Sequence, residues 1–177
     1  LSQVSTSSAG SYRVDVANSS GAQTSGEVAL GILGVPSGLV RGWGSRSFRE
    51  TTTPVNLDSV RSVAAGNHFS VALRQDGTVI AWGDSTRGQT EVPTGLAAVR
   101  AIAAGESHVV AVLNDDTLVA WGSNLFGQAA VPAGLDHIAM VAAGAWHNLA
   151  LRRSGEVIAW GNPDAGRTRV PTDLAAV

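Results

Sequence analysis

The sequence predicts an all-β protein built from repeated units. The stretch from Val60 to Ala98 returns in register at 99–137 and again at 138–176. A fixed period of 39 residues is typical of repeat architectures, in which neighbouring units share a core. Each unit holds three short runs rich in Val, Ile and Ala, and no run has helical length or spacing. Three strands are therefore expected in each unit.

The turns support this reading. In the first unit the apolar runs are 60–65, 69–73 and 78–82, and Asp76-Gly77 lies between the second and third. Asp-Gly predicts a hairpin in which both central residues have positive φ. Ser154-Gly155 repeats the signal, whereas Asp115-Asp116 departs from it with two carboxylates that are expected to be solvated. Pro lacks an N–H, so each third strand is expected to end before Val-Pro.

Residues that are identical in all three units should serve the shared architecture. They are mainly the small residues of Ala-Ala-Gly and the aromatic of Ala-Trp-Gly. Small residues let sheets approach closely and a Trp fills the space between them. The four tryptophans in phase, Trp43, Trp82, Trp121 and Trp160, are thus predicted to be structural rather than a row for stacking sugars. His108 and His147 are expected to bond a neighbouring loop rather than hold a metal.

These residues resemble the repeat of the regulator of chromosome condensation family. The family pattern is Ala-Gly-x-x-His-Ser-x-Ala-Leu, then Asp-Gly-x-Val-x-x-Trp-Gly, then Gly-Gln; 105–108 and 144–147 match its start, with Phe69 where the His is usual. The compact unit is most similar to the bacterial branch, which includes a secreted propeller inhibitor of class A β-lactamases. The resemblance covers 40–177 and implies a β-propeller with three-stranded blades. Of an expected seven blades, about three and a half would be present.

The domain organisation follows from the repeat. Propeller repeats are predicted over 35–177, as a partial blade at 40–59 and whole repeats at 60–98, 99–137 and 138–176. The partial blade is expected to begin with a third strand at Leu39–Trp43. Residues 1–34 resemble the last strands of an immunoglobulin-like sandwich, through Gly10 and Tyr12, with a turn at 18–21 and a last strand at 27–33. A Ser/Gly-rich hairpin or linker is the alternative.

Composition argues against several functions. Charged residues are 15% of the chain, the net charge is −2 and Lys is absent, which argues against nucleic acid as a partner. No apolar stretch is long enough for membrane insertion, and there is no Cys for a disulfide or a thiolate metal site. No motif for a nucleophile, a phosphate or a metal is present, so a non-enzymatic protein without a cofactor is expected. Leu1 is expected to be a cut end of a longer chain.

Variable positions within the constant frame are candidates for binding. One lies after Ala-Ala-Gly-x and holds His68, Ser107 or Trp146; the other precedes the Gly-Gln position. Aromatic and Arg side chains dominate interface hot spots, and a ring in a polar loop invites a covering partner. The predicted partner-binding residues are Trp146, Phe126, Arg87, Phe48 and His68. The alternative is that these rings fold back on their own blade.

Two main functions remain open at this point. The first is a protein-binding propeller module of a larger secreted or surface-attached bacterial protein, and the second is an architectural spacer in such a protein. Inhibition of a class A β-lactamase is a specific form of the first. Guanine-nucleotide exchange, as in the family's nuclear founder, ranks last because a 39-residue unit leaves no room for an inserted wedge. Open blade edges are expected to make the chain associate.

Overall fold

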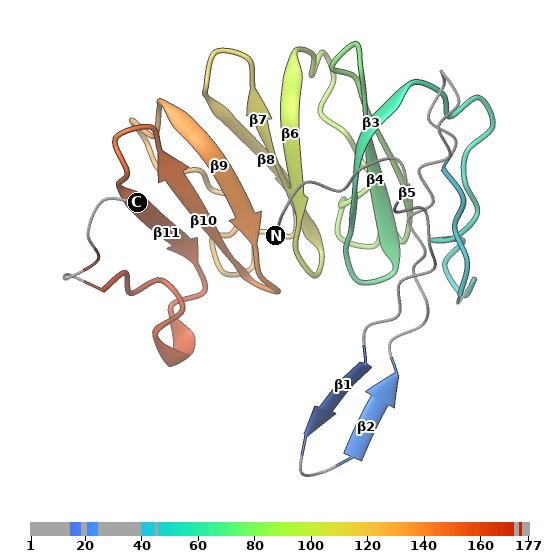
Figure 1. Cartoon of the computed structure of the whole chain (residues 1–177), viewed down its shortest axis with the longest axis horizontal. Coiled ribbons are helices and arrows are strands. Elements are labelled where there is room, and N and C mark those ends of the chain that lie inside the picture. Colours follow the sequence, from blue (N-terminus) through green and yellow to red (C-terminus); the bar gives the residue numbers. More distant parts are fainter. Residues whose placement is uncertain (1–14, 19–20, 25–39, 45, 172–173, 175–177) are drawn as a thin grey trace, which may run out of the picture.

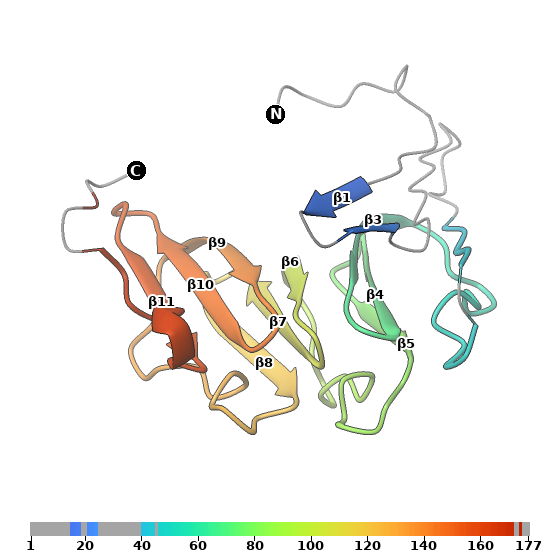
Figure 2. The same ribbon diagram turned by 90° about the horizontal axis from the view of Figure 1, so that it is seen from below.

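The computed structural model describes residues 15–18, 21–24, 40–44, 46–171 and 174. Each whole repeat forms one sheet of three antiparallel strands, and the three sheets stand side by side in chain order (Figures 1 and 2). The strands are β3 (Val60–Ala65), β4 (Phe69–Arg74) and β5 (Val79–Gly83) in the first blade, β6 (Val99–Ala104), β7 (His108–Leu113) and β8 (Leu118–Gly122) in the second, and β9 (Ile138–Ala143), β10 (His147–Arg152) and β11 (Val157–Gly161) in the third.

The strand order is the same in all three blades. The second strand lies in the middle and pairs with the other two, as β4 does with β3 and β5. In β3 the pairing register shifts between Val60 and Ser62, and in β6 it shifts at the equivalent place between Val99 and Ala101. Each first strand therefore carries a bulge at its start. The first strands β3, β6 and β9 contact one another across neighbouring blades. The all-β propeller-blade prediction is therefore confirmed.

The hairpin turns differ from the predicted geometry. Only the second central residue has positive φ: Gly77, Asp116 and Gly155 lie at 83°, 66° and 88°. Gly77 N–H donates to the Arg74 carbonyl at 3.1 Å, and Arg74 N–H donates to the Thr78 carbonyl at 2.9 Å. This pattern is a type I turn followed by one left-handed residue, a common three-residue hairpin loop. The expectation of two positive-φ residues is wrong because the loop holds one residue more than a two-residue turn.

The core lies between blades rather than within them. Along β7, Val109 and Ala111 join Phe69 and Leu73 of the first blade in one buried cluster. Val110 and Val112 join Ile138, Ala150 and Trp160 of the third blade in another. Successive strand residues point to opposite faces, so one blade contributes to two cores. Burying a Val side chain stabilises the fold by about 1.5–3 kcal/mol. The middle strand therefore contributes most to the packing between blades.

The Ala-Ala-Gly glycine is required by two close approaches. A Cβ on Gly105 would lie 2.1 Å from the His108 ring and 2.5 Å from the carbonyl oxygen of Gly144 in the next blade. Gly66 has the same surroundings, with Phe69 as the ring and Gly105 as the carbonyl. Distances this short exclude any side chain. The absence of a side chain at this glycine thus leaves room for an aromatic ring of the same blade and for the glycine carbonyl of the next blade.

The predicted strand of the partial blade is not formed. Residues 40–43 have no strand pairing, although a strand was expected at Leu39–Trp43. In the whole blades a third strand pairs only with the second strand of its own blade, and 40–43 have no such neighbour among the described strands. The strands β1 (Asp15–Asn18) and β2 (Gly21–Thr24) pair on either side of the turn predicted at 18–21. The immunoglobulin-like motif at 8–14 and the strand at 27–33 lie outside the described residues.

Candidate functional site

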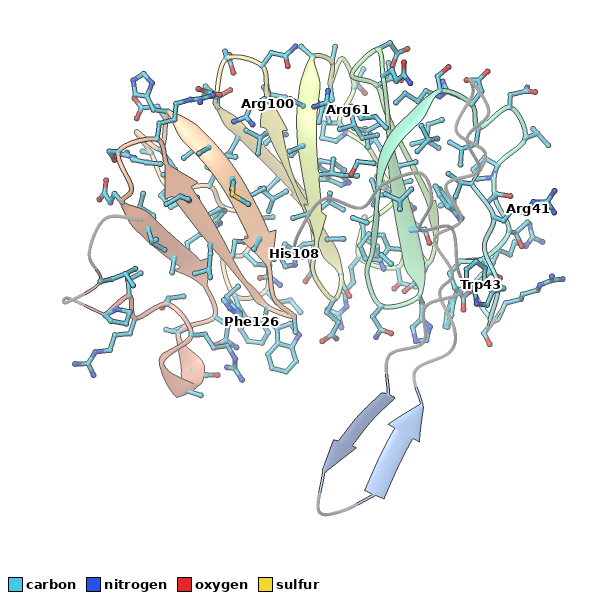
Figure 3. The ribbon with its side chains drawn as sticks, viewed as in Figure 1. Arg41, Trp43, Arg61, Arg100, His108 and Phe126 are labelled. Carbon is cyan, nitrogen blue, oxygen red and sulfur yellow. The ribbon has the colours of Figure 1, made fainter. Side chains whose placement is uncertain are left out.

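The five predicted binding residues lie in loops along one edge of the blades. We call Phe48, His68, Arg87, Phe126 and Trp146 the aromatic rim. Phe126 marks this edge in Figure 3, and Arg61 and Arg100 mark the opposite edge. All five side chains are exposed. His68 has a left-handed backbone, with φ of 63°.

Three equivalent loops hold three of the rim residues, Phe48, Arg87 and Phe126, in one backbone conformation. In each loop the rim residue donates its backbone N–H to the side-chain oxygen two positions later. The bonds are Phe48 to Glu50 at 2.8 Å, Arg87 to Gln89 at 2.9 Å, and Phe126 to Gln128 at 2.8 Å. The Gln of the repeated Gly-Gln therefore fixes the direction in which the residue two places before it projects.

Each loop is also tied to the following blade through a tryptophan. The indole N–H of the repeated Trp donates to the carbonyl of the residue at the Gln position one blade earlier. The bonds are Trp82 to Glu50 at 2.9 Å, Trp121 to Gln89 at 3.1 Å, and Trp160 to Gln128 at 3.2 Å. Trp121 and Trp160 are buried. The structural role predicted for the repeated tryptophans is confirmed for Trp82, Trp121 and Trp160, and it includes a hydrogen bond that the sequence did not suggest.

This docking brings the two variable positions together across two of the blade boundaries. The Phe48 and His68 ring centroids lie 4.5 Å apart with the rings tilted by 40°. Phe126 and Trp146 lie 5.7 Å apart with a tilt of 42°. Tilted aromatic pairs at such distances are attractive. The rings thus pack against a ring of the adjacent blade rather than folding back on their own blade.

The paired rings keep much of their surface in solvent. Phe48 is 42% exposed, Phe126 44% and Trp146 36%. Large apolar side chains of this exposure are informative only when they gather, and here they gather in pairs. Between the two pairs, the equivalent positions hold Arg87 and Ser107. The rim therefore alternates from an aromatic pair to a cation and back to an aromatic pair.

Two further residues extend the second aromatic pair, and sequence reasoning missed both. The Arg167 guanidinium lies 5.5 Å from the centre of the Trp146 ring, within range of a cation–π contact. Arg167 occupies the repeat position that holds Gln89 and Gln128 in the other two units. This change from Gln to Arg was the signal in the sequence that could have identified it. Leu125, next to Phe126, is 67% exposed. The loop of Arg167 contains a 3-10 turn, η2 (Asp164–Gly166).

His108 of the repeat links two blades of the frame. His108 is fully buried, and its Nε2 lies 2.8 Å from Oδ1 of Asn148 on β10 of the next blade. Asn148 donates its amide to the Gln128 carbonyl at 2.8 Å, so Oδ1 is its acceptor and Nε2 of His108 is the donor. Burial lowers the pKa of His108 below its ordinary value. The predicted structural bond is found for His108, with a strand side chain as partner instead of a loop, whereas the buried Nδ1 of His147 has no hydrogen-bond partner among the described residues.

The carboxylate pair on the opposite edge is not simply solvated. Asp116 accepts two hydrogen bonds from Arg153 of the third blade, at 2.7 and 3.1 Å, and lies 2.9 Å from Arg100 of its own blade. The Arg153 hydrogen bond lowers the pKa of Asp116. Asp115 instead accepts hydrogen bonds from Thr117 within the turn. The expectation of solvated carboxylates is wrong for Asp116, because two guanidinium groups converge on it, one from β6 of its own blade and one from the turn after β10 of the next blade.

Two features are absent from the described part of the chain. No group of three or more His, Cys, Asp or Glu side chains among these residues is arranged to hold a metal ion. Of the helices formed by the described residues, none is long and apolar enough to cross a membrane.

Solved structures with the same fold include two from yeast. In the crystal structure of Kap60 bound to yeast RCC1 (Prp20), the match covers 66% of this chain at 28% identity with a TM-score of 0.56. The structure of Prp20p from Saccharomyces cerevisiae, described with its binding properties to Gsp1p and histones, matches 64% of this chain at 28% identity with a TM-score of 0.55. The ectodomain of the Physcomitrella patens receptor kinase CR4 matches 67% at 24% identity and a TM-score of 0.58, which supports the fold alone.

The chain spans about a third of the length of these structures, with 32%, 33% and 35% of them covered. Comparison with curated protein sequences gave no match. The family model of the regulator of chromosome condensation (RCC1) repeat matches residues 60–89, 99–128 and 138–167. These three matches cover about half of the chain and coincide with the three blades. This chain therefore belongs to the regulator of chromosome condensation (RCC1) repeat family.

Proposed function

We propose that this chain is a non-enzymatic protein-binding module and that the aromatic rim is its binding surface. The observation that carries the proposal is the exposed pair of Phe126 and Trp146, whose rings lie 5.7 Å apart across a blade boundary. The frame beneath is built by other residues, so nothing in the packing of the blades requires rings at these positions. Ser107 and Ala165 occupy the equivalent positions elsewhere in the repeat.

The energetics suit a protein partner. Hot-spot residues at protein interfaces contribute about 2 kcal/mol or more each on truncation, and Trp, Tyr and Arg are enriched among them. Two or three rim rings buried together would supply much of the energy of a specific complex. Yeast RCC1 is described in complex with Kap60, and Prp20p with binding to Gsp1p and histones. These relatives support protein binding as a general role of the fold, without indicating the partner of this chain.

The first experiment identifies what covers the rim. A photo-crosslinking phenylalanine analogue is placed at Phe126 in the producing cells, and the crosslinked proteins are identified by mass spectrometry. The matched control carries the analogue at Val55, which is 89% exposed and lies outside the rim. We expect one protein to be enriched at position 126 and absent at position 55. Identical products at both positions would favour the architectural spacer.

The second experiment measures the contribution of the rings. Trp146→Ala and Phe126→Ala should each weaken binding to the crosslinked partner by about tenfold or more while leaving the melting temperature nearly unchanged. Val55→Ala should change neither quantity. Lost stability with intact binding would make the rings packing residues and leave the spacer role ahead.

We also propose that the module acts at the surface of a bacterial cell or in a secreted protein. This rests on the similarity of the compact repeat to the bacterial branch of the family and on the immunoglobulin-like motif at 8–14. Inhibition of a class A β-lactamase is the most specific form of the proposal. It is tested directly by measuring hydrolysis by a purified class A enzyme in the presence of the chain and of Trp146→Ala.

A further inference from the structure

The centre of the aromatic rim differs from its two flanks. Arg87 stands there, with an exposed side chain. Its backbone N–H is bonded to Gln89, but within the described part of the chain its guanidinium has no hydrogen-bond or ion-pair partner. The arginine near the second aromatic pair differs, since Arg167 bonds the Asp164 carbonyl and lies over Trp146. Arg87 is therefore a cation available to a partner.

The geometry of the loops places Arg87 between the two aromatic pairs. Its loop has the same internal bond as those of Phe48 and Phe126, and Trp121 ties it to the next blade as Trp160 ties the loop of Phe126. The side chain of Arg87 thus leaves the rim from the same backbone position as the two phenylalanines. The position that would hold its ring partner is occupied by the small Ser107, so no ring shields the guanidinium.

The nearby carboxylates leave Arg87 unpaired. Both oxygens of Asp84 are used within its own loop, where they accept hydrogen bonds from Thr86 and Gln89. The bond from the Thr86 backbone lowers the pKa of Asp84, which keeps the group ionised, and no ion pair joins it to Arg87 among the described residues. Among the described residues, neither Glu106, beside Ser107, nor Glu91, whose carboxylate lies near Gly88, forms an ion pair with Arg87. A carboxylate supplied by a partner would meet no competitor already bound.

We propose that the aromatic rim recognises an extended protein segment with an acidic side chain between two apolar ones. This rests on the proposed function and specifies its partner. The partner's carboxylate would pair with Arg87, whose planar guanidinium offers a bidentate arrangement of donors. The apolar side chains on either side would cover the Phe48–His68 and Phe126–Trp146 pairs. Alternation of ring, cation and ring along the rim is the pattern that such a segment would complement.

The test is selection of binders from a displayed library of random linear peptides against the purified chain. We expect enriched sequences to carry Asp or Glu flanked on both sides by apolar residues. The same selection against Arg87→Ser should lose this acidic preference, and Arg87→Glu should shift it to Lys or Arg. Arg41→Ser removes an exposed arginine outside the rim (Figure 3) and should leave the preference unchanged.

Affinities of a selected peptide then separate this inference from the proposed function. Binding should fall roughly tenfold to a hundredfold in Arg87→Ser and with Gln in place of the peptide's acid, as expected for loss of a charge-assisted pair. Peptides without an acidic preference that lose binding in Trp146→Ala would overturn the inference and keep the rim as a binding surface. If no peptide is enriched, or if Trp146→Ala binds as well as the wild type, both are overturned.

Discussion

The hydrogen bond between His108 and Asn148 joins the second blade to the third, and the chain itself contains an apolar substitute for it. At the preceding boundary the equivalent positions are Phe69 and Val109, which pack in one buried cluster. The two rings occupy the same place, since a Cβ on the glycine beneath would lie 1.9 Å from Phe69 and 2.1 Å from His108. His108→Phe combined with Asn148→Val therefore copies a boundary that already fits the fold.

The expected free energies of unfolding follow from which polar atoms lose their partners. His108→Phe leaves the buried Oδ1 of Asn148 without a donor, which should cost about 1–3 kcal/mol. Asn148→Val leaves the ring nitrogen of His108 unpaired at a similar cost. In the double variant neither orphan remains, and the Gln128 carbonyl still accepts from Trp160 at 3.2 Å. The double variant should thus be more stable than the sum of the single changes predicts, by about 1–3 kcal/mol.

A pH series gives an independent readout of the same site. Burial lowers the pKa of His108 from its ordinary value of 6.5. Below that value the unfolded chain takes up a proton that the folded chain refuses, so stability should fall as the pH drops towards the folded pKa. The slope is at most about 1.4 kcal/mol per pH unit for one proton. The double variant lacks the ring and should lose this component.

Urea unfolding of the wild type, both single variants and the double variant, at pH values above and below 6.5, measures both effects. Additive losses in the double variant would show that the two side chains do not depend on each other. An unchanged pH slope in the double variant would show that His108 is not held neutral by the fold. Either result would refute the reasoning from this bond.

Three further predictions concern the frame and its open face. Trp121→Phe should lower the free energy of unfolding by about 1 kcal/mol through loss of the bond to Gln89, and Trp121→Ala by about 3–5 kcal/mol through loss of the ring; equal losses in urea unfolding would contradict this. Because pairing with Arg153 lowers the pKa of Asp116 from 3.8, the stability advantage of the wild type over Asp116→Asn should be complete above that pH and shrink as the pH falls below it; a difference in melting temperature that does not vary with pH would refute the ion pair. Leu149 is 38% exposed on the third blade, where Val71 and Val110 are fully buried in the other two, so Leu149→Asn should reduce self-association in light scattering; an unchanged mass would exclude this face as the contact.

The repeated elements could be predicted because their signals are local. The three strands of each unit follow from its apolar runs. Gly77 predicts a turn from its own neighbours, without information from distant parts of the chain. A strand was expected at Leu39–Trp43, but the described residues 40–43 form none, because a strand also needs a partner and the pattern of that segment does not show whether it has one. A periodic sequence indicates which segments resemble strands, but pairing decides which of them become strands.

The candidate site was predictable as a set of positions but not as pairs. Variation within a constant frame identified Phe126 and Trp146 separately. Their contact depends on how one blade docks on the next, through the Trp160 bond to the Gln128 carbonyl, and a single unit read alone does not contain that relation. The same reason explains why Asp116 was expected to be solvated: its partner Arg153 belongs to the following blade.

The sequence separation of the bonds between blades limits how such a chain can be rearranged in evolution. The Trp121 and Trp160 bonds each join residues 32 positions apart, so a 39-residue segment that begins in the loop after a third strand, rather than at a blade boundary, can carry both partners when it is duplicated or exchanged. The His108–Asn148 bond joins residues 40 positions apart. No exchange of a single unit can transfer it whole, so the effect of inserting a copied unit at that boundary depends on the copy. A copy of 138–176 carries both His147 and Asn148 and would keep both polar side chains paired, whereas a copy of 99–137 would place the apolar Val109 opposite a His108 ring. Recombination at this boundary is therefore tolerated for one unit and requires a compensating substitution for the other.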